Sequence, residues 1–186
     1  MILVTGFGPY QEETNASGVL VNSLKGDLPN ELLALENDLA FEVISCDDTS
    51  RETEHQSLES QLRDLLKQYE PELCIYTGQA PPYNKITIEK IATNSFMREI
   101  IDPERPVAYW SDLPGTESLR DAIQNHAIPA GYSFYGGQHL CNHILFSSLY
   151  FAEKETLPHT HIYIYIQSII LLYTVYIPLV EPILVS

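Results

Sequence analysis

The chain has 186 residues, and 45% of them are hydrophobic, a composition typical of a globular protein that buries a substantial core. Its 25 acidic and 10 basic residues give a net charge of −15. Such a surface repels phosphate backbones and anionic membranes, so we expect neither nucleic-acid binding nor adhesion to an anionic membrane.

The three cysteines, Cys46, Cys74 and Cys141, are widely spaced and form no CxxC pair. The N-terminal stretch "MILVTGFGPY" leads directly into sequence typical of a folded domain and does not read as a secretory signal. We therefore expect a reducing, cytoplasmic setting in which each thiol either fills space or takes part in chemistry. Cys74, inside "ELCIY", is predicted to be core, and Cys46 is predicted to be structural.

Apolar runs and helical spacing alternate along the chain, with glycines at several strand ends. Ser17 is the predicted N-cap of the first helix. In chain order, the pattern predicts strand 1–5, helix 17–28, strand 40–46, helix 53–69, strands 71–78 and 85–92, helices 116–127 and 140–151, and strand 160–166.

This alternation predicts a single-domain α/β/α sandwich with a mainly parallel, mixed central sheet. Functional sites in such sheets gather at the carboxyl ends of the strands. We therefore expect the chemistry in the loops that follow Thr5 and Thr77 and in the loop that precedes Cys141.

The C-terminal part contains nineteen uncharged residues between His161 and Glu181, a length that approaches a membrane span. Gln167 and Ser168 interrupt the run, Pro178 lies near its end, and no basic residue follows it. We expect a domain over residues 1–166, with 167–186 as an apolar segment of that domain packed on it or on another subunit. A membrane anchor is the minor alternative.

Cys141 follows two glycines and lies near the start of an apolar helix, "LCNHILFSSLYF". A helix N-terminus lowers the pKa of a thiol, and its N–H groups can bind an oxyanion, so a nucleophile is one interpretation. A buried core thiol is another. A zinc site formed with His139 and His143 would require an extended segment, which the helical pattern opposes.

A cysteine nucleophile also needs a base and a group that orients it. His161 lies near the start of the last predicted strand, and Glu89 lies within the apolar context of "ITIEKIA". Taken alone, each residue is as compatible with an ordinary structural role as with catalysis.

Five stretches together resemble the pyroglutamyl peptidase I (pyrrolidone-carboxylate peptidase) family: "VTGFGPYQEETNAS", "YTGQAPPYNKITIEKIATN", "PVAYWSDLP", "IPAGYSFYGGQHLCNHILF" and "HTHIYIYI". The resemblance implies an α/β/α cysteine peptidase, cytoplasmic and homo-oligomeric, that removes N-terminal pyroglutamyl residues without a metal or other cofactor. It also implies a triad of Glu89, Cys141 and His161, acting through a thioester acyl-enzyme.

The resemblance further implies a pocket for a small neutral lactam. Candidate pocket residues are Phe7, Tyr10, Asn15, Gln79 and His139, the last in place of a phenylalanine of the family. Arg98 is a candidate support for the oxyanion.

The sequence departs from the family where two prolines replace two glycines in "GQAPPYNK" and where the C-terminal stretch lacks the family's prolines and charged helix. Two alternatives therefore stay open. One is a triad-bearing relative that acts on a different small amide, and the other is an inactive homologue that serves as an interaction module.

Overall fold

The computed structural model describes residues 1–10, 14–46, 51–80, 83–111, 114–155 and 160–166. The predicted apolar segment 167–186 therefore lies outside the described residues. The elements are β1 (Ile2–Phe7), α1 (Ala16–Gly26), η1 (Asn30–Asp38), β2 (Leu39–Ile44), α2 (Arg51–Tyr69), β3 (Leu73–Gln79), β4 (Ile86–Glu89), β5 (Ile91–Thr93), β6 (Ala108–Trp110), α3 (Thr116–Asn125), β7 (Ala130–Ser133), α4 (Leu140–Glu155) and β8 (Thr160–Ile166).

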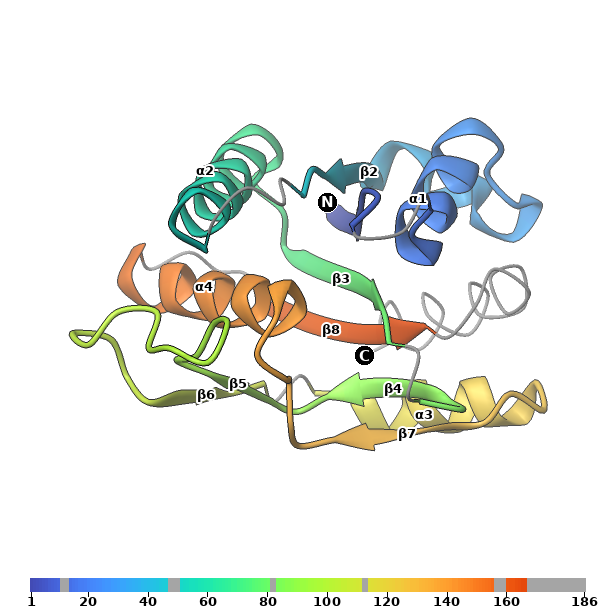
Figure 1. Ribbon diagram of the computed structural model, residues 1–186. Coiled ribbons are helices and arrows are strands. Elements are labelled where there is room, and N and C mark those ends of the chain that lie inside the picture. Colours follow the sequence, from blue (N-terminus) through green and yellow to red (C-terminus); the bar gives the residue numbers. More distant parts are fainter. Residues whose placement is uncertain (11–13, 47–50, 81–82, 112–113, 156–159, 167–186) are drawn as a thin grey trace.

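A central sheet of six strands has the order β2-β1-β3-β8-β4-β7. Neighbouring strands are parallel except β4 and β8, which are antiparallel. Because β8 lies between β3 and β4, the C-terminal strand occupies the centre of the sheet (Figure 1). The predicted mixed, mainly parallel sheet is confirmed.

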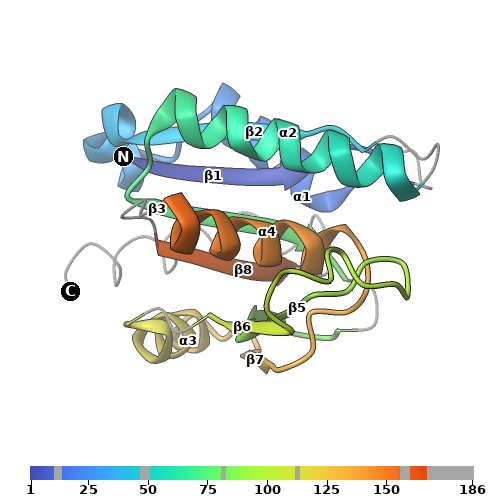
Figure 2. The same cartoon turned by 90° about the vertical axis from the view of Figure 1, so that its left-hand side faces the viewer.

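Helices cover both faces of this sheet, with α1 and α3 on one side and α2 and α4 on the other (Figures 1 and 2). The first face buries Leu20 and Val21 of α1 and Ile123 of α3 in one hydrophobic cluster with the isoleucines of β8. The second face buries Leu62 of α2 and Phe146 of α4. The two-residue period of β8 separates these cores, since Ile162, Ile164 and Ile166 point to one and Tyr163 and Tyr165 to the other. The predicted α/β/α sandwich is therefore confirmed.

The predicted strand 85–92 is wrong in one respect, because it divides at Lys90. β4 belongs to the central sheet, whereas β5 pairs with β6 in a separate two-stranded sheet. The division occurs where Lys90 donates its ammonium to Thr116 Oγ1 at 2.9 Å and its backbone N–H to Ser133 O at 2.9 Å. Alternation of side chains could not reveal this change of sheet.

The start of α1 also differs from the prediction, since Asn15, and not Ser17, is its N-cap. Asn15 Oδ1 accepts a hydrogen bond from Ser17 N at 3.0 Å. Ser17 Oγ instead accepts from Phe7 N at 3.0 Å, which ties the helix to the end of β1. Within the described part of the chain, no helix is both long and apolar enough to cross a membrane.

Candidate active site

A cavity of about 510 Å³ opens where the loops after β1 and β3 meet the loop that leads from β7 into α4. Aromatic side chains dominate its walls, which suits a small, largely apolar ligand. The residues that line it are Phe7, Tyr10, Asn15, Gln79, Ala80, Tyr83, Tyr135, Gly136, Gly137, His139, Leu140, Cys141 and Tyr165.

Cys141 lies in the first turn of α4 and presents its thiol to the cavity. The neighbouring Asn142 fixes this turn, because its side chain accepts from Thr93 N at 2.8 Å and donates to Thr93 O and Ser95 O. Gly136 permits the arrangement, since a Cβ there would lie 2.8 Å from Asn142 Oδ1. The predicted helical start at Cys141 is confirmed, with the first-turn N–H groups close to the thiol.

The surroundings of Cys141 keep its thiol protonated at neutral pH. Although the residue is only half-buried, protein atoms enclose its sulfur, and this burial raises the pKa of the thiol to about 11. The Tyr163 and Tyr165 hydroxyls beside it act in the opposite direction but do not offset the burial. The free thiol in this conformation is therefore a weak nucleophile until a base or a substrate changes its environment.

Two tyrosines of β8 surround the thiol. A Cβ built on Gly78 would lie 1.8 Å from Tyr163 Oη and 3.1 Å from Cys141 Sγ, so these two atoms share the space above a glycine of β3. Tyr165 Oη donates to Gly136 O at 2.9 Å, and its ring lies 4.9 Å from that of Tyr163. Burial, the largest cause, together with the nearby Cys141 and Glu89 raises the pKa of Tyr165 well above its usual value.

Glu89 lies at the end of β4, opposite Tyr163 of β8, and is 1% exposed. Its Oε1 accepts from the backbone N–H groups of Lys90 at 3.1 Å and Ile91 at 3.3 Å. Its buried Oε2 has no hydrogen-bond partner among the described residues. Burial raises the pKa of this carboxyl. The charge of Glu89 also acts on Cys141, so the structure brings these two predicted residues into one neighbourhood.

His161 lies at the other end of β8 and does not line the cavity. Its Nδ1 is 3.1 Å from Tyr76 Oη, and the two rings are stacked at 6.0 Å. His161 shares a face of β8 with Tyr163 and Tyr165, but Tyr165 lies four positions farther along the strand, or roughly 13 Å at about 3.3 Å per residue. The structure thus brings Glu89 toward Cys141 and places Tyr165, not His161, close to both.

The four polar and aromatic residues predicted for the lactam pocket, Phe7, Tyr10, Asn15 and Gln79, all line the cavity. Two of them also hold its walls together. Gln79 Oε1 accepts from Ala16 N at 2.8 Å, and Asn15 Oδ1 accepts from Ser17 Oγ at 2.7 Å. The first contact joins the end of β3 to the start of α1, and the second lies within the start of α1.

His139, two residues before Cys141, lines the cavity at the entry to α4. Arg98 does not line it. That residue is exposed and has a left-handed backbone, with φ of 68°, in the turn after β5. Among the described residues no contact links Arg98 to Cys141, so its predicted support of the oxyanion stays a prediction.

Tyr83, Tyr135, Tyr163 and Tyr165 were not singled out from the sequence, although they form or adjoin much of the cavity. The stretch "HIYIYI" carried a signal for two of them, because tyrosines at alternate positions of a strand point to one face. For Tyr83 and Tyr135, which lie in loops, no periodic pattern was available.

A metal site formed by His139, Cys141 and His143 has no geometric support, because the last two lie on a helix. Two residues correspond to about 200° of helical rotation, so Cys141 and His143 point to different sides of α4. His143 instead faces α2, where it contacts His55.

The family model described as pyroglutamyl peptidase matches residues 1–174 of the chain. A pyrrolidone-carboxylate peptidase of Thermococcus litoralis is 32% identical over 110 residues, which cover 53% of this chain and 50% of that protein. One from Bacillus subtilis is 29% identical over 171 residues, which cover 85% of this chain and 73% of that protein. The chain therefore spans between half and three quarters of the length of these curated relatives.

Solved structures show the same fold. The pyroglutamyl peptidase I of Bacillus amyloliquefaciens superposes with a TM-score of 0.79 at 24% identity, covering 98% of this chain and 96% of that one. A mutant pyrrolidone carboxyl peptidase of Pyrococcus furiosus gives a TM-score of 0.81 at 23% identity, covering 100% of this chain and 98% of that one. With its family model matched over almost the whole chain and its fold shared with these structures, the chain belongs to the pyroglutamyl peptidase family.

Proposed function

We propose that this chain is a cysteine peptidase that removes N-terminal pyroglutamyl residues from peptides, with Cys141 as the nucleophile. The observation that carries the proposal is the position of the thiol. It lies in the first turn of α4, at the wall of an aromatic cavity that contains all five residues expected to bind a lactam. A neutral lactam needs aromatic walls and a few amide hydrogen bonds, not a charged anchor.

In this proposal, the Cys141 sulfur attacks the pyroglutamyl carbonyl carbon, and the thiol proton passes to the amine as the peptide bond breaks. The first-turn N–H groups of α4 are placed to receive the developing oxyanion. Water then cleaves the thioester, which releases pyroglutamate and restores the thiol. Glu89 supplies the buried carboxylate of the triad, and its two backbone hydrogen bonds keep it in place.

The third member of the proposed triad, the base, is His161. His161 can serve only if it leaves Tyr76 and moves toward Cys141, because it lies at the far end of β8 and Tyr165 is the β8 residue close to both Cys141 and Glu89. A second candidate function follows from this observation. It is recognition of pyroglutamyl N-termini with slow or no cleavage. A related candidate is cleavage of a different small amide, which His139 would admit to the cavity.

The first experiment compares hydrolysis of pyroglutamyl-aminomethylcoumarin by the wild-type protein and by Cys141→Ala. Turnover by the wild type that is lost in the variant supports the peptidase. If the folded wild type shows no turnover, calorimetric titration with a pyroglutamyl peptide separates the candidates. Binding supports recognition without cleavage, and the absence of binding contradicts both.

Two further expectations belong to this proposal. We propose that the protein acts in the cytoplasm and forms homo-oligomers, in line with the reduced state of all three cysteines and with the family resemblance. Sedimentation of the full chain tests the oligomer, since a monomer at micromolar concentration contradicts it.

A further inference from the structure

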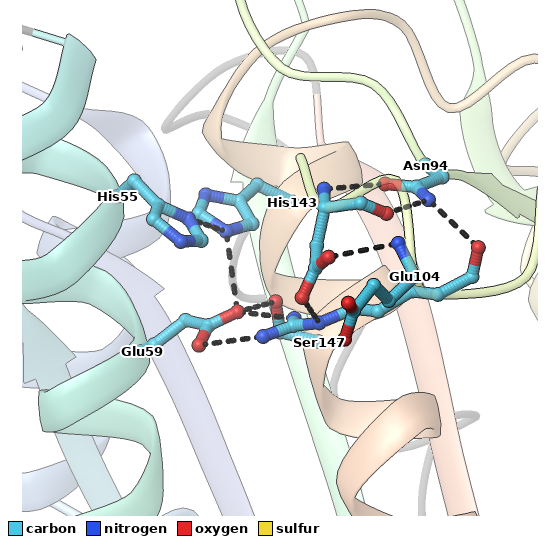
Figure 3. Close-up of polar contacts among 8 residues, drawn as sticks. His55, Glu59, Asn94, Glu104, His143 and Ser147 are labelled. Atoms are coloured by element: carbon cyan, nitrogen blue, oxygen red, sulfur yellow. Dashed lines mark hydrogen bonds and ion pairs between the residues drawn. The ribbon is translucent and has the colours of Figure 1, made fainter. Parts of the chain in front are cut away.

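We propose that His55, Glu59 and His143 form a binding site for a divalent transition metal such as Zn²⁺, separate from the peptidase cavity. His55 and Glu59 lie one turn apart on α2, and His143 faces them from α4 (Figure 3). None of the three lines the cavity around Cys141. The site would join the two helices that cover one face of the sheet.

The three side chains converge closely enough to share one ion. His55 Nδ1 and His143 Nε2 are 2.9 Å apart, and Glu59 Oε1 lies 3.8 Å from His143 Nε2. One ligand atom from each residue lies within 4.8 Å of the other two. Tetrahedral zinc with bonds of about 2.0–2.1 Å holds its ligand atoms roughly 3.3 Å apart. The two separations that involve His143 lie within about half an ångström of that value, and rotation of the half-buried His55 and Glu59 side chains would bring the third pair to it.

The chemistry of the ligands also suits such an ion. Two imidazoles and one carboxylate, with water as the fourth ligand, are a donor set that zinc accepts. His143 is fully buried, and its Nε2 faces both His55 Nδ1 and Glu59 Oε1. His55 and Glu59 are only half-buried, which gives the ion a route from solvent.

The carboxylate is oriented before any ion binds. Arg105 donates to both oxygens of Glu59, at 2.5 Å and 3.2 Å, and Ser147 Oγ donates to Oε1 at 2.9 Å. The pair of Arg105 and Glu59 is an inner ion pair, with both side chains largely shielded from solvent.

The positive charge of Arg105 works against the ion and limits the affinity. Asp102 offsets part of this charge, since its Oδ2 accepts from Arg105 Nε at 3.2 Å. The two carboxylates and one guanidinium leave a local charge of −1 to meet the metal. Because one Glu59 oxygen must exchange a hydrogen bond for the metal, we expect binding in the micromolar range and not the much tighter binding of structural zinc sites.

The test is calorimetric titration of the full chain carrying Cys141→Ser with Zn²⁺, so that the cavity thiol cannot take the ion. We expect one equivalent to bind, and we expect His55→Ala and Glu59→Gln each to weaken binding at least about tenfold, the lower bound for losses around metal sites. His126→Ala, which removes an exposed imidazole after α3, is the matched control and should bind as the parent does.

Co²⁺ supplies a second measurement, because a site of nitrogen and oxygen ligands gives visible d–d bands without the near-ultraviolet band of a thiolate ligand. Unchanged Zn²⁺ affinity in His55→Ala and Glu59→Gln, or a thiolate band that persists in the Cys141→Ser chain, would overturn the proposal. So would an absence of saturable binding by protein whose thermal unfolding shows that it is folded. The hydrogen bond between His55 and His143 would then be purely structural.

Discussion

Tyr165 is the residue of β8 that lies close to both Cys141 and Glu89, where a thiol peptidase would need a base. It lines the cavity, and its hydroxyl lies close enough to both Cys141 and Glu89 for their charges to act on it. A phenol whose pKa lies far above its usual value cannot accept a proton at neutral pH, whereas an imidazole in the same place could.

We therefore expect Tyr165→His to increase the hydrolysis of pyroglutamyl-aminomethylcoumarin. General-base catalysis contributes roughly 10²–10⁴-fold, and an imidazole that is not ideally aligned should give at least about tenfold. The measurement is kcat/KM at pH 7.5 for the wild type and the variant.

The matched control is Tyr165→Phe, which removes the same hydroxyl and its hydrogen bond to Gly136 without adding a base. An equal gain in kcat/KM in both variants would mean that the Tyr165 hydroxyl obstructs the site and that the added imidazole does not act as a base. If His161→Ala abolishes wild-type turnover while Tyr165→His leaves it unchanged, the base is His161 after a movement of β8.

The environment of Cys141 makes its reactivity depend on pH in a defined direction. Burial raises the pKa of the thiol to about 11, so the thiolate fraction is small at neutral pH and grows about tenfold per pH unit. We expect the rate of alkylation by iodoacetamide to keep rising from pH 7 to pH 10 without levelling.

Mass spectrometry of the peptide that contains Cys141 measures this rate without interference from Cys46 and Cys74. Glutathione, an unperturbed thiol, serves as the reference and should level at a lower pH. A plateau for Cys141 below pH 8 would show instead that the helix N-terminus and the tyrosine hydroxyls outweigh burial.

At the scale of elements, the contact between β3 and β8 beneath the thiol depends on a residue without a side chain. Gly78 pairs with Tyr165 in the register of the two strands. A Cβ at Gly78 would meet Tyr163 Oη at 1.8 Å and the ring carbon that carries it at 2.9 Å. The tyrosine is fully buried, so it has little room to move.

We expect Gly78→Ala to lower the free energy of unfolding by about 1–3 kcal/mol, the usual cost of overpacking a core. Urea denaturation followed by circular dichroism measures the loss. In the double variant Gly78→Ala/Tyr163→Phe, removal of the hydroxyl relieves the closest contact, so part of the loss should return.

Gly6→Ala provides the contrasting case, because its Cβ would lie 2.2 Å from the backbone oxygen of Ser17. Substitution of a side chain cannot relieve that contact. If Tyr163→Phe restores nothing in the Gly78→Ala background, then the packing of β8 against β3 is looser than these distances indicate.

At the scale of the whole molecule, the sequence predicted the sandwich and most of the cavity for physical reasons. Helical and strand periodicity report which side chains face a core, and the carboxyl ends of β1 and β3 bring Phe7 and Gln79 to one edge of the sheet. The helical start placed Cys141 correctly.

The positions of the β8 residues relative to the thiol depended on the register in which β8 pairs with β3, and the sequence does not contain this register. His161, Tyr163 and Tyr165 share one face of β8, and only the pairing of Gly78 with Tyr165 decides which of them lies near the thiol. The same holds for the division at Lys90, which depends on its contact with Thr116. A pattern of alternation can name a face of a strand but cannot give a position along it.

The net charge of −15 sets a property of the whole fold. Folding brings the 25 acidic residues closer together than they are in the unfolded chain, so their mutual repulsion opposes the compact state. Salt screens exposed charges over a Debye length of about 10 Å at 0.1 M, whereas the inner ion pair of Arg105 and Glu59 is screened much less. Screening should therefore remove more repulsion than attraction.

We expect the melting temperature to rise by a few degrees between 10 mM and 500 mM sodium chloride, since for a chain of this size 1 kcal/mol corresponds to about 2–4 °C. Scanning calorimetry at constant pH measures the shift. Sodium sulfate at matched ionic strength is the control, because screening depends on ionic strength, whereas exclusion from the protein surface depends on the anion. A rise in sulfate alone would assign the stabilisation to surface exclusion, and a fall in sodium chloride would mean that attractive ion pairs outweigh the repulsion among the acidic residues.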